Sequence, residues 1–454
     1  MTTIRPASVA GTFYPGEAEN LDRCINELVG AAVPPESMPF KAIVVPHAGY
    51  VYSGPIAATA YAAVSHLAER VRRVVLLGPA HRCAFRGVVA PSCAGMTTPL
   101  GTVPVDRAAI ATILNIQGVQ VLDQAFDGEH SLEVQLPFLQ RVLPGASVVP
   151  LLVGDAKPEL VSQVLERLWG GPETLIVIST DLSHYWSYDT ARNLDLVATR
   201  AIESLEVDRL NGNYACGYMP LSGLLLRAMS VDMRATTLDL RNSGDTAGGR
   251  DKVVGYGAYG FEYAATARLS DAHRAILVEA ARLGLVHAAN TGRAMPVDVA
   301  AYPLVLRAVR RTFVTLTQNG ALRGCVGSLA ASGTLIEDVV NNSFRAAMQD
   351  PRFKPMTVAE VDSTAITVSI LSHPRPITFT SERDLLEQLR PEVDGLILRD
   401  RDRQSLFLPK VWHDLPMPAQ FLAHLKQKAG MPVNGISPTL QALRFTAETF
   451  PPEA

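Results

Sequence analysis

The first half of the chain alternates short, wholly apolar runs with longer segments of helical spacing. Unbroken apolar runs are typical of strands buried on both faces, and helices between them indicate a largely parallel sheet covered on both sides. The predicted strands lie within residues 41–46, 72–82, 147–155 and 173–184. We therefore expect a three-layer α/β domain with a largely parallel central sheet.

Turn-forming residues mark the other elements of this domain. We expect Pro55 to open a helix over residues 54–71, because a helix does not need an N–H from its first residue. Residues 158–170 have helical spacing and end at glycines. Residues 87–106 are rich in turn formers and predict a hairpin excursion, and residues 252–262 predict the last strand of the domain.

The pattern changes after about residue 270, where alternating strands replace unbroken apolar runs. The predicted elements are a helix at 271–290, a hairpin at 312–329 with Asn-Gly at its turn, a helix at 334–350, a strand at 363–372, a hairpin at 394–409 and a helix at 418–431. This order indicates an α+β domain. We place the boundary near residue 265, which gives domains at 1–265 and 266–454.

Composition supports two globular domains. The 454 residues exceed one compact core, and 48% hydrophobic with 19% charged residues argue against wholesale disorder. The net charge of -3 gives no overall basic balance, so nucleic-acid binding is not indicated. The five cysteines are scattered and never spaced as CxxC, which favours a reducing compartment over a disulfide framework or a zinc finger.

One uncharged stretch is long enough to cross a membrane. Residues 42–68 contain no Asp, Glu, Lys or Arg. Prolines and glycines interrupt this stretch, so a strand, a loop and a packed helix explain it better than a membrane span. The N-terminal stretch lacks the apolar run of a signal peptide. We expect a cytoplasmic protein that does not span a membrane.

Three predicted strands end in a histidine or in an acid followed by a histidine. His47 and His81 end two of them, and Asp181 and His184 end a third. Ligands of open parallel sheets bind beyond the carboxyl ends of the strands. Neutral imidazole suits iron, copper and zinc. We therefore predict one shared metal site, with a packing role as the alternative for each histidine taken singly.

A site with two histidines needs a third protein ligand, and Cys216 is one candidate. Gly217 and Pro220 follow it and indicate the start of a helix, whose positive end would favour the thiolate that binds metals. A small buried cysteine that only packs is the alternative interpretation.

The segment around His130 is the other candidate. Glu129 and Glu133 are four residues apart and would share one face of a predicted helix. These residues could supply the third ligand or orient the ligand histidines from outside. Acids that simply favour the first turn of a helix are the alternative.

Polar residues of the second domain give weaker signals. Arg323 lies two residues before Cys325 and could lower the pKa of its thiol, although the flanking glycines favour a packing role. Four further charged residues could line a cleft or simply face solvent. They are Arg345, Asp350, Arg352 and Lys410.

Six motifs in order over residues 5–226 resemble the Memo family. They are RPASVAGTFYPGEAENL, VPHAGYVYSGPIAA, LLGPAHR, DGEHSLEVQLPFL, STDLSHY and CGYMPLSGLLL. The chain from about 270 to 450 resembles the AMMECR domain. Its motifs are FVTLTQNGALRGCVGSL, AAMQDPRFKPM, ITVSIL, DGLIL, SLFLPKVW and FLAHLKQKAGM. The chain thus resembles a fusion of proteins B and A of the AmmeMemoRadiSam system, whose third member is a radical S-adenosylmethionine protein.

This resemblance implies a fold similar to the class III extradiol dioxygenases of the LigB type. Those enzymes hold non-haem iron with two histidines and a glutamate, and a further histidine acts as acid and base. The match implies that His47 and His81 are metal ligands and that His184, with Asp181 beside it, moves protons. Cys216 stands in place of the dioxygenase glutamate, and a softer thiolate favours copper or zinc more than that site does.

The resemblance implies a metal-dependent redox enzyme that uses iron or copper, with zinc as a further candidate. It implies a radical SAM protein as partner and a small molecule or peptide as substrate. Two other functions remain open: a non-catalytic module that binds a peptide or ligand, and a metallohydrolase in which the metal activates water.

Overall fold

The computed structural model describes residues 3–33, 39–263, 269–328, 333–433 and 435–451. The chain forms two compact units, Met1–Thr266 and Ala267–Ala454, here named the N-terminal unit and the C-terminal unit. The boundary predicted near residue 265 lies outside the described residues.

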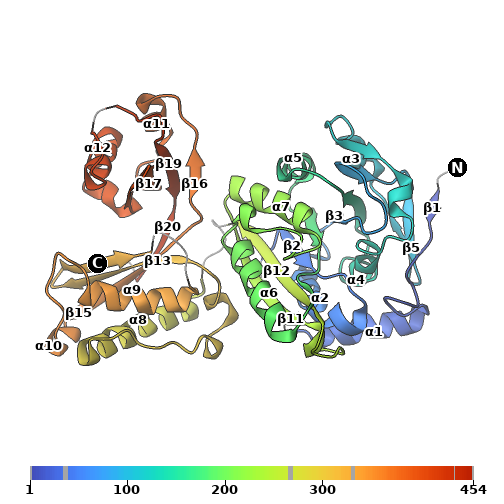
Figure 1. Ribbon diagram of the computed structural model, residues 1–454, viewed down its shortest axis with the longest axis horizontal. Coiled ribbons are helices and arrows are strands. Elements are labelled where there is room, and N and C mark those ends of the chain that lie inside the picture. The colour runs from blue at the N-terminus through green and yellow to red at the C-terminus, as the bar shows by residue number, and fades with distance from the viewer. Residues whose placement is uncertain (1–2, 34–38, 264–268, 329–332, 434, 452–454) are drawn as a thin grey trace. The chain divides into compact units, whose positions relative to one another are not determined.

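Four parallel strands form the centre of the main sheet of the N-terminal unit (Figure 1). They are β2 (Ala42–Val45), β9 (Thr174–Ser179), β3 (Arg73–Pro79) and β8 (Ser147–Val153), side by side in that order. The four strands predicted from apolar runs are therefore confirmed, as is the mostly parallel α/β fold. Because parallel strands share one direction, their carboxyl ends lie at the same edge of the sheet.

Further strands extend this sheet on both sides. Beside β2 lie β12 (Val253–Tyr263), β11 (Met233–Asn242) and β10 (His184–Trp186), all paired antiparallel, and beside β8 lie β4 (Val88–Ala90) and β7 (Val119–Val121). Strand β12 confirms the predicted last strand of the domain.

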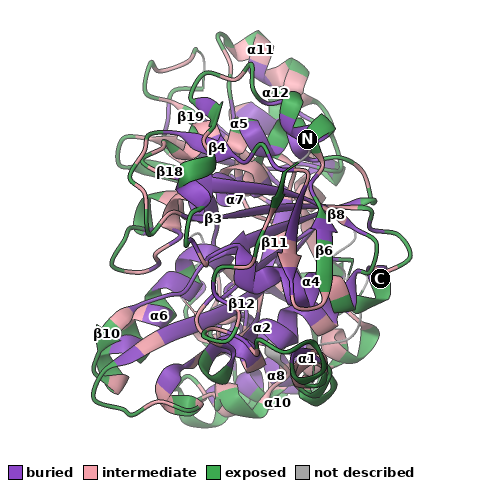
Figure 2. Cartoon of the chain, turned by 90° about the vertical axis from the view of Figure 1, so that its right-hand side faces the viewer, coloured by how far each residue is buried: buried purple, intermediate pink, exposed green. Residues whose placement is uncertain are grey.

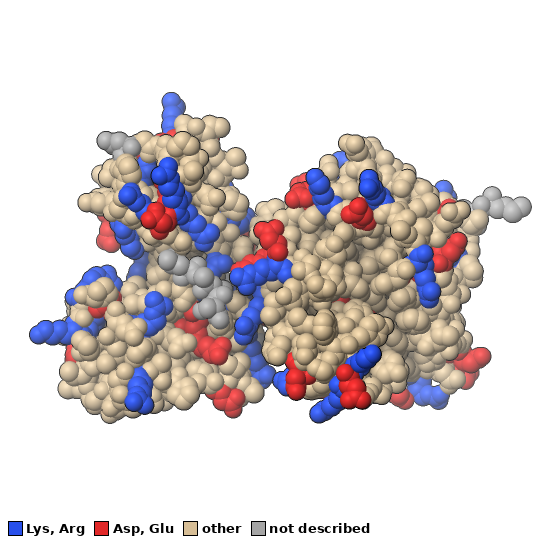
Figure 3. Space-filling view, in the orientation of Figure 1, with Lys and Arg blue, Asp and Glu red and all other residues tan. Residues whose placement is uncertain are grey.

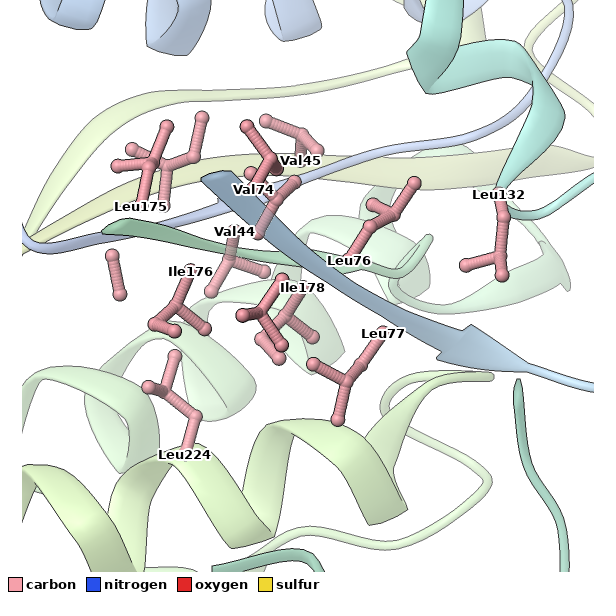
Figure 4. Packing of buried hydrophobic residues seen from close by; sticks show 14 of the residues in the cluster. Val44, Val45, Val74, Leu76, Leu77, Leu132, Leu175, Ile176, Ile178 and Leu224 are labelled. Carbon is pink, nitrogen blue, oxygen red and sulfur yellow. The ribbon is translucent and has the colours of Figure 1, made fainter. Parts of the chain in front are cut away.

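The central strands are apolar because both of their faces are covered. Figure 4 shows Ile176 of β9 on the side of Leu224, which belongs to helix α7 (Tyr218–Ser230), and Leu175 on the opposite side. Strands β3 and β12 are buried along most of their length (Figure 2). Burial on both faces explains why these strands have unbroken apolar runs.

Helices surround the sheet in two groups. Helices α1, α2 and α4 contact one another, whereas α5 and α7 pack together and α6 packs on β11 and β12. The helices are α1 (Ala18–Ala31), α2 (Tyr50–Val64), α3 (Arg107–Ala111), α4 (Leu136–Val142), α5 (Pro158–Leu168), α6 (Tyr188–Glu203) and α7. The helix predicted at 158–170 is thus confirmed.

The predicted start of the second helix is wrong. Helix α2 begins at Tyr50, and Pro55 lies inside it. The Phe13 carbonyl accepts the Tyr50 N–H, and the Gly49 carbonyl accepts the N–H of Ser53, so tertiary and local contacts fix an earlier start. Pro55 is the sixth helical residue and removes one backbone hydrogen bond there.

The turn-rich segment at 87–106 divides between two sheets. Strands β5 (Gly95–Thr98) and β6 (Gly101–Pro104) form the predicted hairpin, and β5 also pairs with β1 (Ile4–Arg5) in a separate small sheet. Strand β4 belongs to the main sheet instead.

The C-terminal unit contains two four-stranded antiparallel sheets and is α+β, as predicted. The first sheet has the order β14-β13-β15-β20 and the second has the order β16-β19-β17-β18. The strands are β13 (Arg311–Gln318), β14 (Ala321–Gly327), β15 (Thr364–Leu371), β16 (Arg375–Ile377), β17 (Gly395–Asp400), β18 (Arg403–Phe407), β19 (Gln441–Phe445) and β20 (Ala447–Phe450). The helices are α8 (Asp271–Thr291), α9 (Leu335–Met348), α10 (Val358–Val361), α11 (Glu382–Gln388) and α12 (Pro418–Lys428).

The hairpin predicted from Asn-Gly is confirmed between β13 and β14. Asn319 and Gly320 have φ angles of 49° and 79°, and a two-residue turn of this hand matches the twist of the flanking strands. The predicted helices at 271–290, 334–350 and 418–431 correspond to α8, α9 and α12.

The two faces of strand β13 have different neighbours. Val314 and Leu316 pack into a core with residues of α8 and α9. Phe313 packs with Ile397 and Phe445 of the second sheet. Because successive side chains of a strand point to opposite faces, Thr315 shares the face of Phe313.

Charged side chains of both signs lie at the surface. Figure 3 shows basic and acidic side chains interspersed over the face in view. Among the described residues, every helix is too short or too polar to span a bilayer.

Candidate metal centre

Adjacent strand ends bring the predicted ligands together. His47 follows β2 and His81 follows β3, and Asp181 follows β9, the strand between them. Cys216 comes from the segment that enters helix α7. The candidate ligand atoms of His47, His81 and Cys216 all lie within 4.8 Å of one another. The structure thus brings the three predicted ligands into one group.

Hydrogen bonds fix the tautomer of His47. The hydroxyl of Ser179 donates its only proton to the Ser131 carbonyl at 2.6 Å, so it can only accept from His47 Nδ1, 3.0 Å away. Gln135 Nε2 donates to the same hydroxyl oxygen at 2.9 Å. The lone pair of His47 therefore lies on Nε2, which is 3.3 Å from Cys216 Sγ.

A carboxylate fixes the tautomer of His81 in the same way. Glu129 Oε1 lies 3.0 Å from His81 Nδ1, and the carboxylate also accepts the backbone N–H of His81. Burial alone would raise the pKa of Glu129, but hydrogen bonds from His81 and Ser131 outweigh it and hold that pKa at about 2. An ionised carboxylate only accepts, so Nδ1 carries a proton, and the neutral form of His81 has its lone pair on Nε2.

His47 is neutral in this environment. Burial, together with a smaller contribution from the neighbouring His81, lowers its pKa to about 3. A neutral imidazole with a free Nε2 lone pair is the form that binds metals.

The expectation of a ready-made thiolate at Cys216 is wrong for the metal-free site. Cys216 does precede α7, but burial raises the pKa of its thiol to about 12, and the nearby Asp181 raises it too. The thiol therefore keeps its proton until a cation displaces it. Gly217 is required next to it, because an added Cβ would lie 2.7 Å from the Thr180 side chain.

Glu129 and Glu133 do not share a helical face, which corrects the prediction. Helix α4 begins only at Leu136, so the segment before it can turn the two acids in different directions. Glu133 accepts hydrogen bonds from the backbone N–H groups of Ser8 and Val9 and from the Tyr14 hydroxyl. Glu133 therefore anchors the N-terminal segment, whereas Glu129 orients His81.

His130 lies against both ligand histidines. Its ring centroid is 4.7 Å from that of His81 and 5.4 Å from that of His47. Burial lowers its pKa to about 4, so its ring is neutral at neutral pH. Its buried Nδ1 lies 3.5 Å from Glu129 Oε1 without a hydrogen-bond partner among the described residues. His81, Glu129 and His130 form a second group that could hold a metal ion.

Asp181 supports His47 more directly than it supports His184. Its Oδ1 accepts the backbone N–H of His47 at 2.7 Å. Burial raises the pKa of Asp181, and that hydrogen bond opposes the shift. His184, at the start of β10, lines the same cavity as Asp181.

A cavity of about 760 Å³ opens over this group. The phenyl ring of Phe13 and the phenol rings of Tyr52, Tyr185 and Tyr256 contribute aromatic walls. Arg82 and Lys252 add positive charge to its lining. The site can therefore admit a small molecule next to the imidazoles.

Sequence reasoning missed Ser179 and Gln135, the residues that orient His47. Ser179 ends β9 two residues before Asp181, so the rule that flagged the strand-end histidines could also have flagged this hydroxyl. Gln135 belongs to the segment around His130, in which only the two acids and the histidine were predicted as site residues. Its contact with Ser179 is long-range and left no signal in the local pattern.

We expect Ser179→Ala to weaken metal binding by about 10- to 100-fold, the range typical of residues that orient a metal ligand. Without this hydroxyl, His47 can place its proton on Nε2 instead. Competition with a chromogenic chelator measures the affinity. The control is Ser343→Ala in the C-terminal unit, which also removes a buried hydroxyl that donates to a backbone carbonyl. Equal losses in both variants would contradict this role of Ser179.

The charged residues predicted in the C-terminal unit do not all lie together. Arg323 does not contact the Cys325 thiol, because its Nε donates to Glu360 Oε1 at 2.8 Å. Arg345 donates to Asn342. The other three predicted residues, Asp350, Arg352 and Lys410, surround the Cys325–Thr315 pair.

Comparisons with known proteins agree with this architecture. The family described as "Memo-like protein" matches residues 5–259, and the family described as AMMECR1 matches residues 278–450. A MEMO1 family protein of Aquifex aeolicus is 35% identical over 264 residues, which cover 56% of this chain and 97% of that protein. Another from Methanosarcina acetivorans is 36% identical over 269 residues, which cover 56% of this chain and 98% of that protein.

A MEMO1 family protein of Ignicoccus hospitalis is 35% identical over 285 residues, which cover 57% of this chain and 98% of that protein. These matches span nearly the full length of each relative. The Memo-like match lies in the N-terminal unit, whereas the AMMECR1 match lies in the C-terminal unit. The chain belongs to the Memo family, and in it a Memo-like domain is fused to an AMMECR1 domain.

Proposed function

We propose that the N-terminal unit is a metal-dependent redox enzyme. The observation that carries this proposal is the pair of free Nε2 lone pairs on His47 and His81 beside the Cys216 thiol. These three side chains would hold iron or copper, with zinc as a further candidate, because imidazole and thiolate suit all three. A redox-active metal held there would supply electron transfer and a position for dioxygen or substrate.

The residues around the ligands suit a proton-coupled reaction. His184 lines the cavity and would move a proton to or from the substrate. Asp181 holds the backbone at His47 and so keeps one ligand in place. The aromatic walls favour an aromatic or otherwise oxidisable substrate, and Arg82 and Lys252 favour one with a negative charge.

We also propose a radical SAM protein as the partner of this chain. The support is that the chain resembles two members of a three-protein system in one polypeptide, and the third member is a radical SAM protein. The C-terminal unit would then bind the substrate or that partner.

Oxygen uptake by the metal-loaded protein, supplied with an extract of cellular small molecules, tests the proposed activity. We expect uptake in the loaded protein, and a decrease of about 10²- to 10⁴-fold in His184→Gln with unchanged metal content, the range for loss of a general acid or base. Substrate turnover that is unaffected by strict anaerobiosis would favour a metallohydrolase. Binding of a small molecule or peptide without turnover would favour a binding module.

A further inference from the structure

His130 has a buried nitrogen that the metal centre described above does not use. Its Nδ1 is shielded from water and forms no hydrogen bond within the described parts of the chain. A buried polar atom without a partner costs free energy, so it points to something that the atom binds in the working protein. His130 belongs to the set His81, Glu129 and His130, here named the second group; His47, His81 and Cys216 are the first group.

The spacing of the second group is close to that of a metal site. Glu129 Oε1 lies 3.0 Å from His81 Nδ1 and 3.5 Å from His130 Nδ1. Nitrogen and oxygen ligands at about 2.0–2.2 Å from a tetrahedral ion lie about 3.3–3.6 Å from one another. The two imidazole planes are 23° apart, with their centroids separated by 4.7 Å. Small side-chain shifts would therefore close the three ligand atoms around one ion.

Glu129 is a fixed carboxylate without a permanent cation. Its Oε1 accepts the backbone N–H groups of His130 and Ser131 at 2.9 Å each, and its side chain is only 2% exposed. Within the described residues its ion-pair partners are the two histidines, and neither carries a permanent charge. Buried carboxylates are as a rule paired with a cation or bound to a metal, so the charge balance also favours an ion here.

His81 offers one nitrogen to each group. In the form that Glu129 favours, its Nε2 lone pair serves the first group, and Nδ1 faces Glu129. Metal ligands must give up their protons, and an imidazole that loses its N–H proton as well has a lone pair on both nitrogens. The ring of His81 can therefore join two ions.

We propose that Glu129, His130 and His81 Nδ1 hold a second divalent metal ion, which the His81 ring bridges to the ion of the first group. Imidazole and carboxylate together suit zinc and similar divalent ions. Either ion alone can bind neutral His81. When both are present, a bond forms between the second ion and Nδ1, and the proton of Nδ1 passes to solvent. This inference rests on the proposed metal centre, because His81 belongs to both groups.

The charges of the ligands fit two divalent ions. The Cys216 thiolate, the bridging His81 imidazolate and the Glu129 carboxylate supply three negative charges to four positive ones. Pairing of this kind offsets the cost of burying ions close together.

Titration of the metal-free full chain with Co²⁺ in the absence of oxygen tests the proposal. We expect two ions to bind per chain, and one of them to give a near-ultraviolet sulfur-to-cobalt charge-transfer band, because the first group alone contains a thiol. The other ion should add visible absorption and leave that band unchanged. Saturation at one ion per chain would overturn the proposal.

His130→Phe removes the nitrogen but keeps a ring that can pack against Phe13 and His81. We expect this variant to bind one Co²⁺ where the wild type binds two, with the charge-transfer band retained. His66→Phe is the matched control, because His66 is an exposed histidine of the same unit, in the 3-10 helix Ser65–Leu67. A His130→Phe protein that still binds two ions, or a His66→Phe protein that loses one, would contradict the second site.

Electron paramagnetic resonance tests whether His81 is shared. A bridging imidazolate couples the unpaired electrons of the two ions, so the fully loaded wild type should give a weaker signal than two separate Co²⁺ ions. Signals that simply add would place the second ion away from His81 and overturn the proposal. One ion with the sulfur band would reject the second site and keep the metal centre, whereas a missing sulfur band would reject the metal centre and this proposal with it.

Discussion

Replacing Cys216 by alanine is expected to weaken metal binding by more than about 100-fold, since even residues that only orient a ligand are worth about 10- to 100-fold. The variant keeps both imidazoles but loses the sulfur that lies 3.3 Å from His47 Nε2. His47→Ala and His81→Ala should have effects of similar size, because each removes one of three ligands. Elemental analysis after anaerobic purification measures the metal content, and chelator competition measures the affinity.

Cys93→Ala is the matched control for this series. Cys93 is a buried, free cysteine of the same unit, so its loss reports the cost of removing a packed thiol without touching the site. A metal bound only to the folded state also raises the melting temperature of the wild-type protein, and this increase should disappear in Cys216→Ala and persist in Cys93→Ala. Identical metal content in the wild type and all three ligand variants would refute the metal centre.

Metal affinity is expected to rise by about tenfold per pH unit across the neutral range. The metal-free thiol of Cys216 has a pKa of about 12, so it carries a proton that the metal must displace. Raising the pH lowers the proton concentration that competes with the metal, and the affinity therefore increases. His47, with a pKa of about 3, is already neutral and adds nothing to this slope.

Chelator competition at a series of pH values and constant ionic strength measures this dependence. In Cys216→Ala the slope of log affinity against pH should fall by about one, because metal binding no longer displaces the thiol proton. The affinity itself should also be lower. A wild-type affinity that does not change with pH would mean that the sulfur is not a ligand or that it is already ionised in the free protein.

The sequence predicted the fold and the main site well for a physical reason. Strands buried on both faces have unbroken apolar runs, and parallel neighbours end at one edge of the sheet. Residues placed directly after β2, β3 and β9 therefore had to lie close to that edge once the strands were adjacent. His47 and His81 could be identified from this rule. Cys216 was one of two candidates for the third ligand, from its place before a predicted helix, and the resemblance to the Memo family favoured it.

Features fixed by tertiary contacts could not be predicted locally. The start of helix α2 depends partly on the Phe13 carbonyl, which is far away in sequence. The different roles of Glu129 and Glu133 depend on His81 and on the N-terminal segment, respectively. The high pKa of Cys216 results from burial, which the helix-start argument did not include.

The anchoring of the N-terminal segment by Glu133 has a practical consequence for experiments. This carboxylate holds Ser8, Val9 and Tyr14. Phe13, next to Tyr14, has its ring centroid 4.5 Å from that of His130 and forms part of the cavity wall. A purification tag or a short deletion at this end is therefore expected to disturb the wall of the cavity over the candidate metal centre. Samples that differ only in their tag should be compared before any loss of binding is assigned to a histidine.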